Sequence, residues 1–121
     1  MFVLICTALP HENIWRLRSE NIDEDITAYY QDSMEHPLPG VFITFPCTHD
    51  PQWATRSPGI SNAIVIAEAP YEIFSQWSDA RVHKRGGDYE QLKETFAHKM
   101  FDELYRICPQ VQGTVVIVVV V

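Results

Sequence analysis

The sequence has few of the residues on which several common kinds of site depend, beginning with cysteine. Its 121 residues include three cysteines, and no two of them form a C-x-x-C pair. An odd, widely spaced set suits neither a disulfide framework nor a zinc site. We therefore expect Cys6, Cys47 and Cys108 to be reduced thiols packed among other side chains, and we expect no metal site.

Glycine is scarce as well, with five residues in the whole chain. The glycine patterns that hold dinucleotides or phosphates, G-x-G-x-x-G and the P-loop, are absent from the sequence. The nucleophile pattern G-x-S-x-G and the metal pattern H-E-x-x-H are absent too. The residues alone therefore indicate no cofactor-binding residue, and they leave the catalytic residues unknown.

Basic residues are outnumbered by acidic ones, 9 against 16, which gives a formal net charge of -7. Nucleic-acid binding needs a basic surface, so the balance argues against that class of partner. A polybasic contact with anionic lipid is disfavoured for the same reason. The apolar run at residues 115–121 is far shorter than the ~20 residues that cross a bilayer, and we expect no transmembrane segment in this chain.

Two apolar runs, residues 41–45 and 63–69, dominate the middle of the chain, and a proline follows each of them. With 46% hydrophobic residues, the chain has enough apolar side chains to bury a core. Strands that are apolar on both faces are usually covered on both sides. We expect helices against one face of these strands and some other cover against the second, with an absent second cover as the alternative in so small a chain.

A polar segment, residues 47–62, joins the two runs and shows no clear element of its own. A connection of this length is more often functional or specific to packing than a plain hairpin tip. His49 and Asp50 are adjacent there, and one interpretation of them is an acid–base pair. Neighbouring side chains in an extended segment point apart, and no nucleophile motif accompanies them, so we favour a structural role.

Helical patterns flank this central region. The first covers residues 21–34, where Asp23 is the expected N-cap. Aromatic residues recur every three positions after Pro70, which predicts a short helix. The longest helix is expected to begin at Asp88, which forms a D-x-x-Q capping box with Gln91, and to end near Pro109.

Strand patterns occur towards both ends of the chain. Residues 2–6 form an apolar run, and residues 14–18 alternate between apolar and basic side chains, which predicts a half-exposed strand. Residues 114–121 are almost wholly β-branched. Two interpretations of this tail stay open, a buried strand whose partners lie beyond this chain and a sequence artefact at a truncated end. Together with the helices, these strands predict an α+β fold.

Five motifs occur in an order that is typical of one enzyme family. They are PGVFITFPCTHDPQW, RSPG, IVIAEAPYEIFSQW, KRGGDYEQLKETF and ICPQVQG. In this order they resemble an internal segment of the all-trans-retinol 13,14-reductases (retinol saturases), which belong to the FAD-dependent phytoene desaturase-like oxidoreductases. A shorter pattern, TxDP…PG…AP, resembles the wider desaturase group. Seven residues carry it: Thr48, Asp50, Pro51, Pro58, Gly59, Ala69 and Pro70.

The resemblance implies an antiparallel sheet with packed helices, as part of a larger flavoprotein fold. Residues 1–113 would form a partial substrate domain without the dinucleotide-binding domain, while residues 114–121 depart from the family pattern. The full-length family implies FAD, with NAD(P) as a further candidate cofactor, and a membrane-associated location in the endoplasmic reticulum. This chain lacks the glycine turn that holds FAD, so we expect the chain alone to bind none.

The substrate that the resemblance implies is an apolar polyene, retinol or a carotenoid. A pocket for such a molecule needs an apolar and aromatic lining with few polar groups. The candidate lining residues are Phe42, Phe45, Trp53 and Ile66. The expected function is that of a fragment of an FAD-dependent oxidoreductase acting on a carbon–carbon double bond, inactive as an isolated chain. The alternatives are a non-enzymatic module that binds an apolar ligand or a partner, and an unrelated α+β domain.

Overall fold

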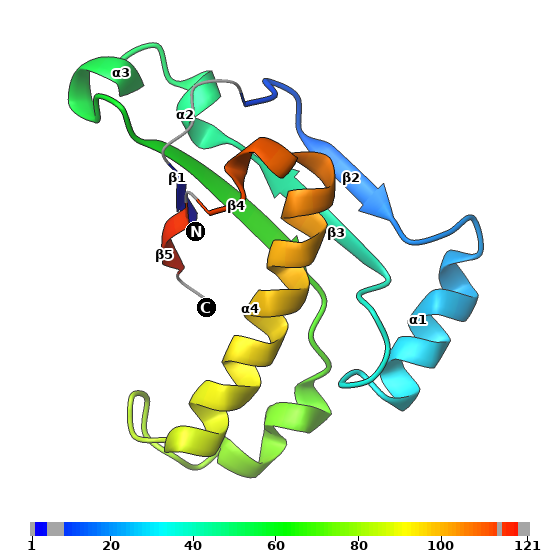
Figure 1. Cartoon of the computed structure of the whole chain (residues 1–121). Coiled ribbons are helices and arrows are strands. Elements are labelled where there is room, and N and C mark those ends of the chain that lie inside the picture. The colour runs from blue at the N-terminus through cyan, green and yellow to red at the C-terminus, as the bar shows by residue number, and fades with distance from the viewer. Residues whose placement is uncertain (1, 5–8, 114, 119–121) are drawn as a thin grey trace.

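A computed structural model describes residues 2–4, 9–113 and 115–118 of the chain. Within this part, five strands form one sheet in the order β2-β3-β4-β1-β5, and each neighbouring pair is antiparallel (Figure 1). The strands are β1 (Phe2–Leu4), β2 (Ile14–Leu17), β3 (Gly40–Thr44), β4 (Ser61–Ala67) and β5 (Val115–Val118). An antiparallel sheet with packed helices confirms the predicted α+β class.

The helices differ greatly in length, and α4 is much the longest. They are α1 (Ile22–Gln31), α2 (Pro46–His49), α3 (Trp53–Arg56), the 3₁₀ helix η1 (Tyr71–Trp77), α4 (Gly87–Ile107) and the 3₁₀ helix η2 (Pro109–Val111). The aromatic spacing after Pro70 agrees with the three residues per turn of a 3₁₀ helix. Helix α4 ends just before Pro109, as predicted.

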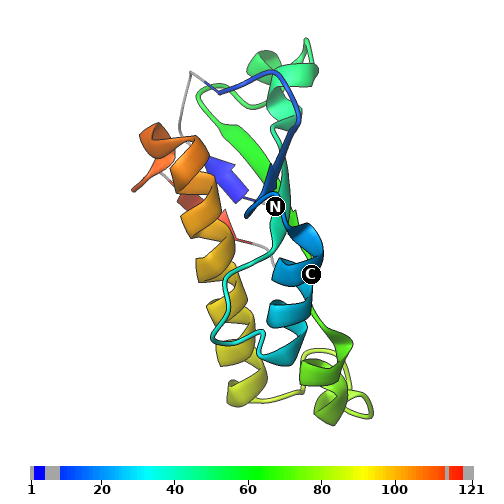
Figure 2. The same ribbon diagram turned by 90° about the vertical axis from the view of Figure 1, so that its right-hand side faces the viewer.

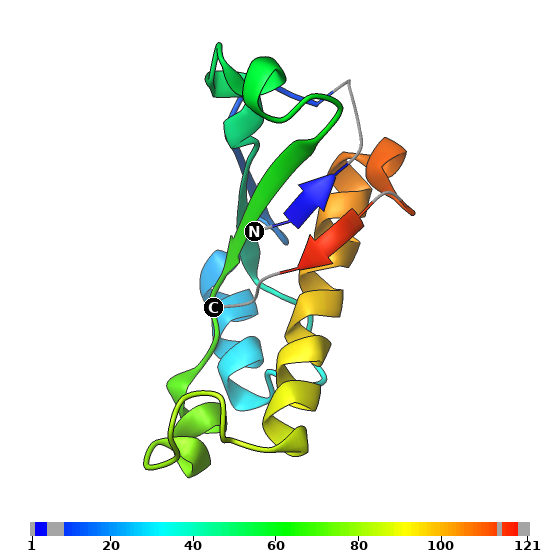
Figure 3. The ribbon, with the colours of Figure 1, turned by 90° about the vertical axis from the view of Figure 1, so that its left-hand side faces the viewer.

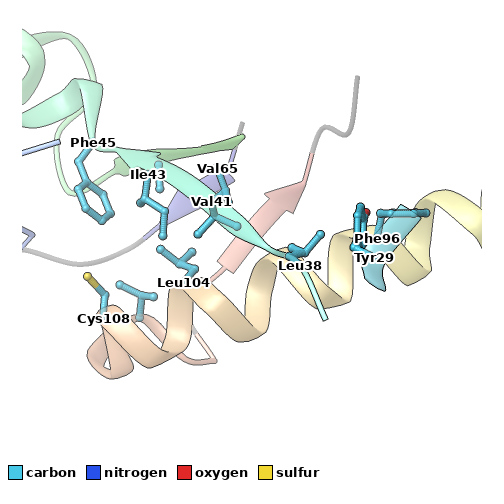
Figure 4. Close-up of a cluster of buried hydrophobic side chains, with 11 residues drawn as sticks. Tyr29, Leu38, Val41, Ile43, Phe45, Val65, Phe96, Leu104 and Cys108 are labelled. Atoms are coloured by element: carbon cyan, nitrogen blue, oxygen red, sulfur yellow. The ribbon is translucent and has the colours of Figure 1, made fainter. Parts of the chain in front are cut away.

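Helix α4 packs along one face of the sheet, as the two side views show (Figures 2 and 3). Its Leu104 is fully buried and lies close to Val41 and Ile43 of β3 (Figure 4). Side chains alternate between the two faces of a strand, so Val41, Ile43 and the following Phe45 share this buried face. The hydrophobic core therefore lies between α4 and one side of the sheet.

Helix α1 is attached to α4 by one charged side chain and one aromatic one. The Nζ of Lys99 on α4 donates hydrogen bonds of 2.6, 2.8 and 2.8 Å to the carbonyl oxygens of Ser33, Met34 and His36, just after α1. Partial burial lowers the pKa of Lys99. Tyr29 of α1 is fully buried in the core, so both contacts fix α1 beside the sheet.

The segment predicted to have no element of its own, residues 47–62, contains two short helices. Pro46 occupies the first turn of α2, where its missing N–H requires no partner. The side chain of Asp50 accepts a 2.9 Å hydrogen bond from the backbone N–H of Gln52, which shapes the turn into α3. The prediction for this segment was wrong because Pro46 and the Asp50 side chain stabilise these two short helices locally.

Two predicted helix caps were also wrong. Helix α1 is capped at Asn21 and not at Asp23, and α4 is capped at Gly86 and not at Asp88. Gly86 has a φ of 89°, a left-handed conformation that glycine adopts without strain. The two aspartates lie in the first turns of their helices, where a carboxylate interacts favourably with the helix dipole.

Strand β5 lies within the apolar tail and pairs with β1 of the same chain. Strand β5 thus has a hydrogen-bonded neighbour within this chain. This differs from the interpretation that placed the partners of a tail strand beyond this chain. Among the described cysteines, Cys47 is a free thiol, as predicted, and Cys108 is fully buried in the core. The prediction for Cys6 lies outside the described residues.

Candidate functional site

The face of the sheet opposite α4 carries a row of apolar side chains that crosses three strands. The backbone register places Trp15 of β2 opposite Phe42 of β3, and Phe42 opposite Ile66 of β4. The ring centroids of Trp15 and Phe42 lie 4.8 Å apart. Trp15 and Ile66 are 75% and 57% exposed. A contiguous exposed apolar surface of this kind marks a ligand groove or an interaction site.

A groove of about 610 Å³ opens over this row, a volume within the range of roughly 300–1,000 Å³ that is usual for small-molecule sites. Its floor comes from β2, β3 and β4, and its end wall comes from α1. The residues that line it are Trp15, Leu17, Ile22, Ile26, Pro39, Gly40, Val41, Phe42, Ile66, Ala67 and Glu68. The lining is almost entirely apolar, which suits an apolar ligand.

Gly40 lines the groove where β3 meets the end of β2. It pairs with Leu17, and a Cβ atom built on Gly40 would lie 3.1 Å from Leu17 Cδ2 and 3.3 Å from the carbonyl oxygen of Arg16. Such contacts are tighter than ordinary van der Waals packing. The missing side chain therefore lets Leu17 of β2 lie closely against β3 at this end of the groove.

Two consecutive tyrosines of α1 hold Glu68 at the end of the groove. The Tyr29 hydroxyl donates a 2.8 Å hydrogen bond to the backbone carbonyl of Glu68, and the Tyr30 hydroxyl donates to its carboxylate oxygen Oε1. Burial raises the pKa of Tyr29, and the hydrogen bond to Glu68 raises the pKa of Tyr30. Glu68 is thus fixed through both its backbone and its side chain.

The face of β2 that points away from the groove carries a charged side chain, which contacts α4. Arg16 forms an ion pair with Glu103 of α4, whose other carboxylate oxygen lies 3.4 Å from Arg106 Nη1. A polar hollow of about 270 Å³ lies beside these groups. Strand β2 alternates as the sequence predicts, with its charged side towards α4 and its apolar side exposed.

The four candidate lining residues do not share one site. Phe42 and Ile66 lie in the groove. Phe45 lies three positions after Phe42 and therefore on the opposite face of the sheet, where it is fully buried in the core on the α4 side. Trp53 lies on α3, where its indole N–H donates to the carbonyl oxygen of Ile60, beside a separate hollow of about 250 Å³. The structure thus brings two of the four together.

The residues of the shorter motif shape the segment between β3 and β4 and the turn after β4. Thr48 donates a 2.8 Å hydrogen bond to the carbonyl oxygen of Phe45, and Asp50 pairs with Arg56. Gly59 has a φ of 71°, which favours glycine. The prolines of the motif are Pro51 and Pro58, which lie in turns on either side of α3, and Pro70, which precedes η1. None of these six residues lines the groove.

His49 makes a ring contact with His11, with the ring centroids 4.6 Å apart. In the described part of the chain, no cluster of three or more histidine, cysteine, aspartate or glutamate residues could hold a metal ion. The helices in that part include none that is long and apolar enough to cross a bilayer.

Sequence reasoning missed several groove residues, which share a position on an exposed apolar face. They are Trp15, Leu17, Ile22, Ile26 and Glu68. The alternation of residues 14–18 indicated a face for the first two. The spacing of four residues between Ile22 and Ile26 places them on one side of a helix. Glu68 stood out as the one charged residue in an apolar run.

Comparison with known proteins identifies relatives of this chain. No protein-family model and no solved structure matches it. It is 32% identical over 111 residues to the all-trans-retinol 13,14-reductase of Homo sapiens and 38% identical over 81 residues to that of Rattus norvegicus. These matches cover 88% and 67% of this chain.

A further relative, from Danio rerio, is named an inactive all-trans-retinol 13,14-reductase and is 32% identical over 88 residues. The chain spans a small part of these relatives, 18% of the length of the human protein and 13% of that of the rat protein. The motif order and these identities agree. The chain therefore belongs to the all-trans-retinol 13,14-reductase family.

Proposed function

We propose that this chain forms one wall of the binding site for an apolar polyene, retinol or a carotenoid, in an oxidoreductase that acts on a carbon–carbon double bond. The observation that carries the proposal is the apolar groove on the sheet face that α4 leaves uncovered. A polyene chain has no hydrogen-bonding groups along its length, and the lining of the groove offers few hydrogen-bonding partners. The relatives' name, all-trans-retinol 13,14-reductase, supplies the substrate class and the reaction type.

The cofactor that the resemblance implies is FAD, with NAD(P) as a further candidate. The described residues do not fit a dinucleotide. Every strand pairing among them is antiparallel, and no glycine-rich turn leads from a strand into a helix. In this proposal, another part of a longer protein holds the flavin, which supplies the redox chemistry. This chain contributes an apolar surface that positions the polyene and excludes water from it.

The cofactor part of the proposal is tested by purifying the 121-residue chain and recording its absorption spectrum. We expect no flavin band. Stoichiometric flavin absorbance would overturn the claim that FAD is held elsewhere. The association with the endoplasmic reticulum membrane is part of the same proposal and rests on the resemblance alone.

The substrate part is tested by titrating all-trans-retinol into the purified chain and following the quenching of tryptophan fluorescence, because Trp15 lies in the groove. The variant Ile66→Asp places a charge on the groove floor, and we expect at least a tenfold loss of affinity. Ile60→Asp is the matched control, since Ile60 is 44% exposed and lies outside the groove. Loss of retinol binding in Ile60→Asp alone would indicate that retinol binds in the hollow beside Trp53 and not in the groove.

A second candidate function is a non-enzymatic module that binds an apolar ligand. The groove consists entirely of residues of this chain, and one relative is itself named inactive. Cooperative unfolding of the monomer together with saturable retinol binding favours this candidate over an incomplete fragment. An aggregated or molten product would exclude it.

A further inference from the structure

The groove has one charged residue in an otherwise uncharged lining, and that residue lies at one end of it. Glu68 follows directly after β4, two positions beyond Ile66, so both side chains belong to the same face of the sheet. The Val41–Ala67 pair places Gly40 next to Glu68 across the strands. Gly40 and Glu68 therefore line the same end of the groove.

A carboxylate on the rim of an apolar surface normally rotates freely in water, but the carboxylate of Glu68 is held in place by a hydrogen bond. The Tyr30 hydroxyl donates to Oε1, and the Tyr29 hydroxyl donates to the carbonyl oxygen of the same residue. The two tyrosines belong to the helix that also supplies the groove wall. Fixing Glu68 at two points orders its carboxylate before any ligand arrives, which lowers the entropy lost on binding.

A carboxylate with one oxygen engaged keeps acceptor capacity on the other. No described residue donates a hydrogen bond to Oε2 of Glu68. A ligand hydroxyl is the natural donor for such an oxygen, and a ligand carboxylate would meet a like charge. An apolar body of the ligand would then extend from Gly40 across Phe42 and Ile66.

We propose that Glu68 is the polar anchor of the groove: its carboxylate accepts a hydrogen bond from the terminal hydroxyl of a polyene alcohol and so fixes which way round the ligand lies. This inference rests on the proposed polyene site and adds the residue that sets orientation and end-group preference. Glu68 contacts the ligand directly. Tyr30 is a positioning residue that acts through Glu68.

The experiment measures the dissociation constants of all-trans-retinol, all-trans-retinoic acid and the corresponding methyl ether at pH 8, by quenching of tryptophan fluorescence. The acid is ionised at this pH, and the ether has no hydroxyl donor. Hydrogen bonds to charged groups are strong enough for a preference of about tenfold. We expect the wild-type chain to bind the alcohol about tenfold more tightly than the acid or the ether.

The variant Glu68→Gln removes the charge and keeps the shape, so the ratio of acid to alcohol affinity should approach one. Glu72→Gln is the matched control, because Glu72 is a nearby exposed carboxylate that does not line the groove. It should leave the ratio unchanged. Tyr30→Phe should reduce the preference for the alcohol while leaving the affinity for the ether unchanged, which a merely structural role would not do.

The outcomes separate this inference from the function on which it rests. If retinol binds and Ile66→Asp abolishes binding, but Glu68→Gln leaves the ratio unchanged, Glu68 is not the anchor and the polyene site stands. An equal change in Glu72→Gln would also overturn the inference, since it would show a general effect of charge. If none of the three ligands binds the wild-type chain, both the anchor and the polyene site fall.

Discussion

The division of the sheet into a packed face and a free face can be tested with two isoleucines on neighbouring strands. Ile43 of β3 is fully buried under α4, and Ile66 of β4 is 57% exposed in the groove. Replacing each by alanine makes the same chemical change in the same kind of element, so the difference in strand propensity cancels. Any difference in the free energy of unfolding then reports on packing.

The expected magnitudes follow from burial. Truncating a fully buried isoleucine removes its transfer free energy and leaves a cavity, which costs about 2–5 kcal/mol. Full burial of an isoleucine side chain is worth ~1.5–3 kcal/mol, and less than half of Ile66 is buried, so Ile66→Ala should cost about 1 kcal/mol. We therefore expect Ile43→Ala to be the more damaging change by at least ~1 kcal/mol.

The assay is urea unfolding followed by circular dichroism. With a slope of about 1–3 kcal/mol per molar urea for a small protein, Ile43→Ala should lower the midpoint by about 1 M or more. Ile66→Ala should lower it by a fraction of that. Equal shifts in the two variants, or a larger shift for Ile66→Ala, would refute the assignment of the free face.

Three further predictions concern the groove and its supports. Gly40→Ala places a Cβ 3.1 Å from Leu17 Cδ2 and should destabilise the fold by about 1–2 kcal/mol in urea unfolding. The added variant Leu17→Ala should recover part of that loss, and no recovery would contradict the steric cause. Lys99→Met removes three hydrogen bonds to carbonyl oxygens after α1, which should cost about 1–3 kcal/mol and speed amide exchange in residues 33–38; unchanged exchange there would contradict it. The hydrogen bond to Glu68 raises the pKa of Tyr30 above its ordinary 10.0. The stability that this hydrogen bond gives the fold is therefore fully present below pH 10 and is lost as the pH rises through the raised pKa of Tyr30. The 295 nm titration of the wild type minus that of Tyr30→Phe should show this late ionisation, and a transition at or below pH 10 would count against it.

Local patterns were sufficient to predict the strands of the central region and the long helix. The alternation of side chains along residues 41–45 also separates Phe42 from Phe45, since residues an odd number apart lie on opposite faces. Treating both as lining residues overlooked this period of two. The burial of Phe45 beside Ile43 follows from the same count.

Contacts between distant residues could not be predicted in this way. Arg16 and Glu103 are 87 positions apart, and their ion pair links the charged side of β2 to α4. Tyr30 and Glu68 are 38 positions apart, and nothing local to either residue indicates the other. The polar end of the groove depends on the tertiary fold, so it became visible only in the structure.

The two faces of the sheet have different consequences for how this family can diverge. The core side chains of β3 and α4 are shared by many packing contacts, so most replacements there lower stability. The row of Trp15, Phe42 and Ile66 lies on the other face, and two of the three are largely exposed. Substitutions in this row can reshape the groove at little cost to folding. The surface of the groove can therefore change while the core beneath it keeps its packing.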